Sequence, residues 1–199
     1  LEGEARRYAA AKDYVLRAIA SDPTNSDYFF DLGTYCRYLG DYAAAEKAWR
    51  QTTVLEPDYF LGYVYLAGIC EEKERWGEAL EYYRKVIEKN PEYYYAYESV
   101  GILAWREKSY DEARKAFEQA LKTKPGDISY TLMVAACYLK LKDTYNCKKF
   151  TEAAMKGMDR NSTEYMLVRM FHDMAGDAPV GIKIQSEESR NKKGKYLFY

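Results

Sequence analysis

Residues 57–91 read PDYFLGYVYLAGICEEKERWGEALEYYRKVIEKNP, a stretch that begins and ends on proline. The step between these two prolines is 34 residues, and it recurs on both sides, at Pro23, Pro57, Pro91 and Pro125. Because proline makes up about 5% of average sequences, three further prolines fall in one chosen column by chance with a probability of roughly 10⁻⁴. A fixed period of this length is typical of a repeat array.

Other sequence columns keep the same step. An alanine stands twelve residues before each proline, at Ala11, Ala45, Ala79 and Ala113. An aromatic residue stands fifteen residues before it, at Tyr8, Tyr42, Trp76 and Tyr110. A bulky apolar residue stands eight residues before it, at Val15, Trp49, Tyr83 and Phe117. Pairs of an aliphatic and a small residue form a further column, at Leu32-Gly33, Leu66-Ala67, Val100-Gly101 and Val134-Ala135.

Packing explains why such columns recur. A small residue lets two helices cross closely, and a large residue fills the space beside it. Proline ends a unit because it cannot continue a helix and biases the preceding residue away from helical angles. Each unit therefore has room for two helices of about a dozen residues, a first and a second helix, with two short turns.

The columns resemble the tetratricopeptide repeat, whose pattern runs W-x-x-L-G-x-x-Y, then A-x-x-x-F, then P. One unit matches with Phe29-x-x-Leu32-Gly33-x-x-Cys36, Ala45-x-x-x-Trp49 and Pro57. The next matches with Tyr63-x-x-Leu66-Ala67-x-x-Cys70, Ala79-x-x-x-Tyr83 and Pro91. The third matches with Tyr97-x-x-Val100-Gly101-x-x-Ala104, Ala113-x-x-x-Phe117 and Pro125. The resemblance covers about residues 1–160 and implies an all-α fold, a right-handed α-solenoid of stacked antiparallel helix pairs.

The register divides the chain into units of one solenoid domain. We expect the second helix of a truncated repeat at 1–23, repeats at 26–59, 60–93 and 94–127, a degenerate repeat at 128–161, and a last region at 162–199. Because the first unit lacks its first helix and the chain begins with Leu1, we expect a piece of a longer protein.

The last two regions depart from the pattern. Cys147 replaces the alanine, Thr151 the aromatic and Asp159 the proline. A further first helix is expected at about 162–175, with Tyr165 and Val168 on its packing face.

The regular repeat pattern is expected to end after that helix. Gly176-Asp177-Ala178-Pro179 breaks it, and the polar residues that follow, within 176–194, form a loop, a weak helix or a linker. Tyr199 falls again in the register of Phe29, so a further helix is expected to start there.

Composition excludes several classes of partner. The net charge of −1 argues against nucleic acid, which requires a basic footprint. No apolar run approaches the ~20 residues that span a bilayer, so no membrane span is expected. The four cysteines form no CxxC and are interpreted as small core residues, in preference to disulfides or metal ligands. A reduced state fits a cytoplasmic protein, and the sequence indicates no compartment beyond this.

No catalytic site, metal or cofactor is expected. His172 is the only histidine, and we interpret it as a surface or packing residue. The sequence contains no GxGxxG, GxxxxGK[ST], GxSxG or HExxH. The acidic pair Glu71-Glu72 is expected at a helix end on a solvated face. The sequence therefore predicts that the chain is not an enzyme.

The resemblance also implies where a partner would bind. In the tetratricopeptide family, the first helices of successive repeats line a concave groove. The groove-facing positions that this implies are Phe30, Thr34, Arg37, Tyr38, Val64, Gly68, Glu71, Tyr95, Glu98, Ile102 and Trp105. Some members hold an acidic C-terminal peptide with a lysine–asparagine clamp. The matching positions carry no lysine, arginine or asparagine, being Phe30, Thr34, Tyr65, Tyr95 and Ser99. The resemblance therefore does not extend to chaperone-tail binding.

Aromatic anchors in a desolvated groove are where binding energy concentrates. We therefore expect a protein or peptide partner with apolar or aromatic anchors, such as an amphipathic helix, and a role as an interaction scaffold or assembly factor. Alternatively, the same residues contact a neighbouring helix of this chain. Two further functions stay open: self-association as a homo-oligomer, and presentation of a partner or substrate within a larger enzyme or sensor.

Overall fold

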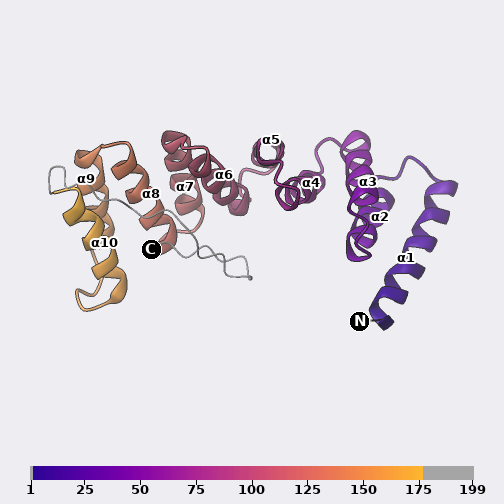
Figure 1. The fold of residues 1–199 in the computed structure, drawn as a ribbon, viewed down its shortest axis with the longest axis horizontal. Coiled ribbons are helices and arrows are strands. Elements are labelled where there is room, and N and C mark those ends of the chain that lie inside the picture. Colours follow the sequence, from indigo (N-terminus) through magenta and orange to yellow (C-terminus); the bar gives the residue numbers. More distant parts are fainter. Residues whose placement is uncertain (1, 177–199) are drawn as a thin grey trace.

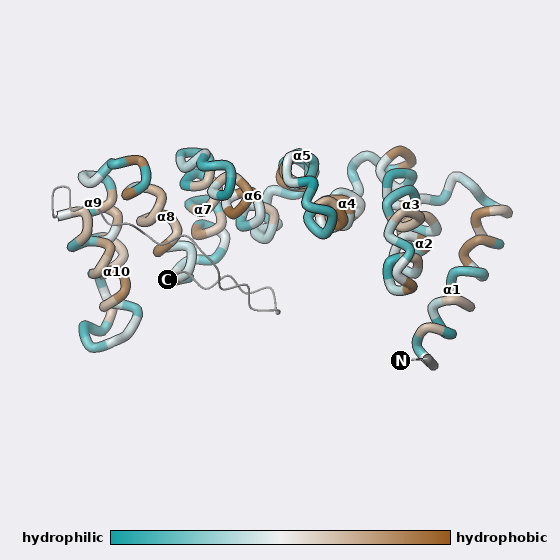
Figure 2. Tube along the Cα trace, in the orientation of Figure 1, coloured by the Kyte–Doolittle hydropathy of each residue, from teal (hydrophilic) through white to brown (hydrophobic). Residues whose placement is uncertain are grey.

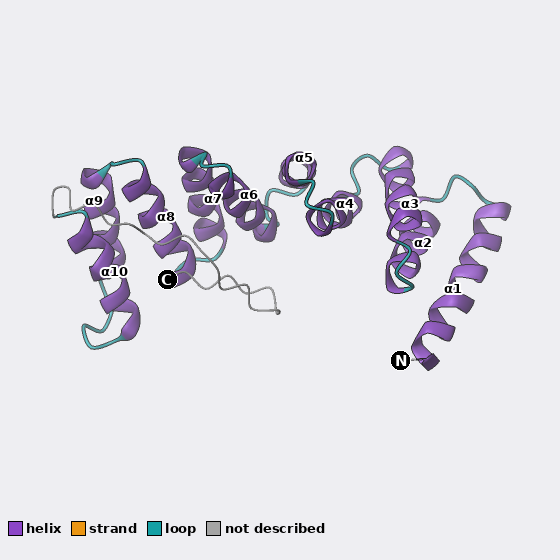
Figure 3. Ribbon diagram, viewed as in Figure 1, coloured by secondary structure: helices purple, strands orange, loops and turns teal. Residues whose placement is uncertain are grey.

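The computed structural model of the chain describes residues 2–176, and their regular secondary structure is entirely α-helical (Figure 3). The helices are α1 Glu2–Ser21, α2 Ser26–Tyr38, α3 Tyr42–Leu55, α4 Phe60–Glu72, α5 Trp76–Lys89, α6 Tyr94–Arg106, α7 Tyr110–Thr123, α8 Ile128–Lys140, α9 Thr144–Met155 and α10 Thr163–Met174. The expected behaviour of 177–194 and of Tyr199 lies outside the described residues.

The helices form antiparallel pairs that follow one another in a row, from α1 at one end to α10 at the other (Figure 1). The first helices α2, α4, α6 and α8 begin at Ser26, Phe60, Tyr94 and Ile128, and so keep the 34-residue step of the prolines. The second helices α3, α5, α7 and α9 each pack against their own first helix and against the first helix that follows, and α1 packs against α2. The predicted all-α solenoid is confirmed.

The proline column lies in the turns that follow the second helices. Pro57 is the second residue of a turn that is closed by the Tyr59 N–H, which donates to the Glu56 carbonyl at 3.1 Å. The turn after α5 repeats this bond, from Tyr93 N–H to the Asn90 carbonyl at 3.1 Å, with Pro91 between them. Proline suits this place because its fixed φ matches the second position of the turn.

The turns inside the helix pairs use a residue with left-handed backbone angles. It stands in one further column with the same step, at Gly40, Glu74, Lys108 and Lys142, where φ is between 56° and 80°. Such a residue lets the backbone N–H groups beyond the helix end reach its last carbonyls, as in the bond from Asp41 N–H to the Cys36 carbonyl at 2.9 Å. The sequence analysis missed this column because three different residue types occupy it.

The small-residue column marks where paired helices cross. A Cβ atom added to Gly101 would stand 2.6 Å from the Phe117 ring, and one added to Gly33 would overlap the Trp49 ring. Trp49 and Phe117 are both buried in the core. The close crossing predicted from the glycines is therefore confirmed.

Burial also follows the predicted columns. All four cysteines are in the reduced form and fully buried, as the core interpretation predicted. Burial raises the pKa of the Cys137 thiol to about 12 and that of Cys147 to about 11. α4 contains brown, apolar segments in Figure 2, and it packs between α3 of the preceding repeat and α5 of its own repeat.

α10 is the last helix of the row within the described residues. In α10, which lies where a further first helix was expected, Val168 is fully buried. His172 packs against α9, where its Nδ1 lies 3.0 Å from the hydroxyl of the buried Thr151. The hydroxyl that replaces the aromatic side chain of this column therefore has a polar partner in the next helix.

Candidate functional site

The eleven residues predicted to face a partner lie on α2, α4 and α6, and we call them the first-helix surface. Two of their aromatic side chains are strongly exposed, Tyr38 at 63% and Tyr95 at 52%. The others are exposed to smaller degrees and, apart from Gly68, contact residues of the same chain, as described helix by helix below.

On α2, the ring of Phe30 packs between two tyrosines, one just before α4 and one within it. Its centroid lies 5.2 Å from that of Tyr59 and 5.2 Å from that of Tyr65, with edge-to-face geometry in both cases. The Thr34 hydroxyl donates to the Phe30 carbonyl at 3.1 Å. Trp49 Nε1 donates to the same carbonyl at 3.1 Å, so this part of α2 is held firmly.

The C-terminal end of α2 carries Arg37 and Tyr38. Arg37 Nη2 donates to Glu72 Oε1 at the end of α4, at 2.8 Å. The Tyr38 ring stacks on Tyr8 of α1, with centroids 4.4 Å apart and planes within 4° of parallel. Both side chains therefore link neighbouring repeats while part of each remains open to solvent.

On α4, the three predicted residues differ in their surroundings. Val64 packs against the apolar core, and a Cβ added to Gly68 would meet no atom within 4 Å. Glu71 is half-buried, and its Oε2 accepts a hydrogen bond from the Tyr83 hydroxyl at 3.2 Å. Burial raises the pKa of Glu71, and the hydrogen bond from Tyr83 opposes this. The expected solvated position was therefore wrong for Glu71, whose partner stands twelve residues away, and right for the exposed Glu72.

On α6, Tyr95 belongs to a run of stacked tyrosines. Its ring stacks on Tyr94 at 4.0 Å and lies 5.8 Å from Tyr93. Tyr93 in turn contacts Phe60 at 5.3 Å, across to the first residue of α4. These contacts fix the orientation of Tyr95, so an exposed aromatic ring is held on the surface before any partner arrives.

The remaining residues of α6 face the next repeat. Glu98 Oε2 accepts a hydrogen bond from the Tyr130 hydroxyl of α8 at 3.1 Å. Ile102 and Trp105 pack against the cluster that α7 and α8 bury, and the Trp105 ring meets Tyr110 edge-on at 5.1 Å. The alternative of contacts within the chain thus applies to Glu98, as it does to Phe30 and Arg37, while Tyr95 and Tyr38 keep large exposed areas.

The sequence analysis did not notice that acidic residues adjoin the α2 part of this surface. Asp27 and Asp31 stand four residues apart on α2, and within residues 2–176 neither forms an ion pair. Burial, and then the charge of Asp27, raise the pKa of Asp31. Burial and the carboxylates of Asp27, Glu56 and Asp31 likewise raise the pKa of Tyr59. The i, i+4 spacing of two like charges on one helix face could have identified this acidic pair from the sequence.

The described residues show no arrangement typical of other kinds of site. Within residues 2–176, no three His, Cys, Asp or Glu side chains gather as they would around a metal ion. None of the helices described is both long enough and apolar enough to cross a membrane.

A sequence model of the family described as tetratricopeptide repeat matches residues 1–49, 30–93 and 71–128. No curated protein matches the sequence. Among solved structures, YrrB, described as a TPR protein with an unusual peptide-binding site, has a TM-score of 0.64 and 11% identity, over 83% of this chain and 86% of that one. MamA has a TM-score of 0.60 and 18% identity, over 85% of this chain and 91% of that one. PilF of Pseudomonas aeruginosa has a TM-score of 0.57 and 18% identity, over 85% and 82%. At these identities the likeness establishes the fold alone.

Proposed function

This chain belongs to the tetratricopeptide-repeat family, and we propose that its first-helix surface binds a protein segment with apolar or aromatic anchors. The family and its structural neighbours support a protein-interaction scaffold in general. The binding of a particular kind of segment, by residues of α2, α4 and α6 and without catalysis, is our proposal.

The exposure and the fixed orientation of the Tyr95 ring are the main support for this proposal. A tyrosine that is 52% exposed and stacked on Tyr94 loses little conformational freedom when a partner covers it. Large, rigid aromatic side chains of this kind dominate the energy of protein interfaces. Gly68 adds open space on α4, where a Cβ added to the glycine would meet no atom within 4 Å.

A selection from random peptides displayed on phage tests the proposal. The full chain, a Tyr95→Ala variant and a Tyr145→Ala variant would be used in parallel, with circular dichroism to confirm that all remain helical. Tyr145 is a matched control because it is a tyrosine of α9 that is 73% exposed. We expect peptides rich in aromatic and aliphatic residues that bind the full chain and the control, and bind Tyr95→Ala about thirtyfold more weakly. Equal affinity for all three would contradict the proposal.

Self-association is a second candidate, favoured by the outer face of α10. Met166, Leu167 and Met170 are exposed there together, and exposed apolar patches mark contacts. Light scattering of the full chain and of a Met166→Glu/Met170→Glu variant tests this. A dimer that becomes a monomer in the variant would support self-association through α10, and a monomer in both would refute it.

A further inference from the structure

A cleft of about 400 Å³ lies between α3 and the turn that follows α4. We call it the α3 cleft, and its lining residues are Ala43, Glu46, Lys47, Arg50, Gln51, Val54 and Lys73. None of them belongs to the first-helix surface. The cleft is therefore a separate candidate for binding.

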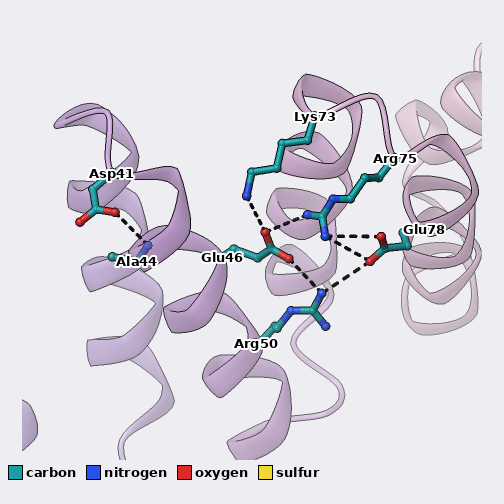
Figure 4. A network of polar contacts seen from close by, with 7 residues as sticks. All are labelled: Asp41, Ala44, Glu46, Arg50, Lys73, Arg75 and Glu78. Atoms are coloured by element: carbon teal, nitrogen blue, oxygen red, sulfur yellow. Dashed lines mark hydrogen bonds and ion pairs between the residues drawn. The ribbon is translucent and has the colours of Figure 1, made fainter.

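A single carboxylate organises the cations of this cleft (Figure 4). Glu46 accepts hydrogen bonds from Arg50 at 2.9 Å, from Lys73 at 2.9 Å and from Arg75 at 2.8 Å. Its side chain is only 13% exposed, whereas those of Arg50 and Lys73 are exposed to 48% and 39%. Glu46 thus lies behind the cations and holds them in place, while each cation keeps a face toward solvent.

The cleft has more positive than negative charge. Three cations, Lys47, Arg50 and Lys73, line the cleft with one carboxylate, Glu46. Arg75 and Glu78 adjoin it through ion pairs with Glu46 at 2.8 Å and with Arg50 at 3.7 Å, so that four cations stand against two carboxylates. The whole chain, in contrast, carries a net charge of −1. Among the described residues Lys47 has no ion-pair partner. An unbalanced positive site on a slightly acidic protein is complementary to an anionic partner.

The third repeat indicates that this excess is not a consequence of the repeat architecture. Two repeats further along the chain, Arg114 replaces Glu46, Glu118 replaces Arg50, and Asp143 replaces Arg75. There Arg114 bonds to both Asp111 and Glu118 at 2.8 Å. Three cations then stand against three carboxylates, the six residues being Arg114, Lys115, Lys122, Asp111, Glu118 and Asp143.

An apolar side chain at the α3 cleft sets a second requirement for its partner, in addition to negative charge. Val54 is 69% exposed at its edge, and Ala43 also lines it. In the third repeat the residue at the position of Val54 is Lys122. A simple anion would leave Val54 uncovered, whereas a peptide segment can place an aliphatic side chain over it.

We propose that the α3 cleft binds an acidic segment of a partner protein, in which carboxylates flank one aliphatic side chain. The carboxylates bond to Lys47, Arg50 and Lys73, and the aliphatic side chain covers Val54. Because Glu46 already orients the cations, they lose little freedom when the segment binds. The interaction is electrostatic at a partly exposed site, so it weakens as salt is added.

Fluorescence anisotropy with a labelled synthetic peptide, Gly-Glu-Asp-Leu-Glu-Asp-Gly, tests the proposal on the full chain. The variant Lys47→Glu/Gln51→Glu reverses charge in the cleft without removing a bond to Glu46. Its matched control is Lys115→Glu/Gln119→Glu, because these residues occupy the same positions two repeats later. We expect the cleft variant to bind about tenfold more weakly and the control to change by less than about twofold.

Two further measurements make the outcome decisive. A peptide with serine in place of the leucine should bind several-fold more weakly, and raising the salt should weaken both peptides. An equal loss in the cleft variant and its control would mean attraction by net charge alone, and would overturn the proposal. Complete displacement by inorganic phosphate at low millimolar concentration, with no effect of the leucine, would overturn it in favour of a simple anion site. Tyr95→Ala should leave this binding unchanged, so failure here is separate from failure of the first-helix surface.

Discussion

Glu46 of α3 and Arg114 of α7 occupy the same position in two repeats, yet they carry opposite charges. Glu46 is surrounded by Arg50, Lys73 and Arg75, and Arg114 by Asp111 and Glu118. The Arg114 guanidinium also lies 5.3 Å from the centre of the Tyr138 ring, and the Tyr138 hydroxyl donates to Glu118 at 3.0 Å. Each central charge is satisfied, one by cations and the other by carboxylates and an aromatic ring.

The difference shows which residues of this solenoid determine the fold and which vary between repeats. The apolar columns are the same around both residues, with Ala45 and Trp49 beside one and Ala113 and Phe117 beside the other. The fold therefore depends on these columns, and the charges between repeats are free to invert as a set. Such inverted sets give each part of the surface its own electrostatic character, on which a partner can discriminate.

Acidification should separate the two clusters most strongly. Burial acts to raise the pKa of Glu46, but the bonds from Lys73, Arg75 and Arg50 outweigh it and bring the pKa from 4.5 to about 2. Because the folded-state pKa is the lower one, Glu46 stabilises the fold above pH 4.5, and this contribution is lost as the pH falls to about 2. The loss is about 3 kcal/mol.

Chemical unfolding of the full chain at several pH values checks this. The free energy of unfolding of Glu46→Gln should fall less between about pH 5 and pH 3 than that of the wild type. The control Arg114→Gln should keep the part of the pH dependence of the free energy of unfolding that comes from Glu46. Identical slopes for the wild type and Glu46→Gln would show that the cluster does not hold a charged Glu46.

Removal of the central charge at neutral pH should also affect the clusters unequally. Glu46→Gln leaves three cations facing one another and should destabilise the chain by about 2 kcal/mol. Arg114→Gln leaves only two carboxylates, of which Asp111 keeps its ion pair with Lys115 at 2.7 Å, and should cost about 1 kcal/mol. Urea unfolding followed by circular dichroism measures both, and the reverse order of the two values would contradict the comparison.

The turns that precede the two second helices offer a smaller test. Gly40 and Lys108 occupy the same left-handed position before α3 and α7, with φ of 80° and 61°. Lysine is strained at this angle and glycine is not, so Lys108→Gly should stabilise the chain by about 0.5 kcal/mol. The reciprocal Gly40→Lys should destabilise it by about 1 kcal/mol. Thermal unfolding midpoints would be compared, and shifts of the same sign in both variants would refute the explanation.

The surface variants should have the smallest effect on stability. Lys47→Glu/Gln51→Glu and Lys115→Glu/Gln119→Glu change side chains outside the core, so each should alter the free energy of unfolding by less than about 0.5 kcal/mol. The same urea titration measures both. A larger loss in the cleft variant alone would mean that Lys47 supports the fold as well as the proposed binding.

The features that could be predicted from the sequence are those that depend on periodic packing of the helices. The glycines beside Trp49 and Phe117 indicated close helix crossings because a column of small residues has one physical cause. The i, i+4 pair of Glu46 and Arg50 could have been predicted from helical spacing, but the rest of the cluster could not, because Lys73 and Arg75 stand 27 and 29 residues from Glu46 and meet it only through packing between repeats. The contact of His172 with Thr151 was missed for the same reason, since it depends on how α10 packs on α9.

The first-helix surface was predicted in outline only. Helical spacing placed its residues on common faces of α2, α4 and α6, but it could not tell which side chains turn toward the next repeat. Phe30, Arg37 and Glu98 do so, because Tyr65, Glu72 and Tyr130 stand opposite them. Tyr95 remains exposed because its ring stacks within its own turn of chain.

Photo-crosslinking from two glycines tests most directly whether this surface binds a partner segment. Gly68 of α4 lies on the first-helix surface, Gly77 of α5 does not, and a Cβ at either meets no atom within 4 Å. Each would be replaced in turn by p-benzoylphenylalanine in the full chain, which would then be irradiated with an aromatic-rich peptide obtained by the phage selection. The proposed function predicts that the peptide is captured from position 68 and not from position 77. Capture from position 77 alone, or equally from both, would contradict it.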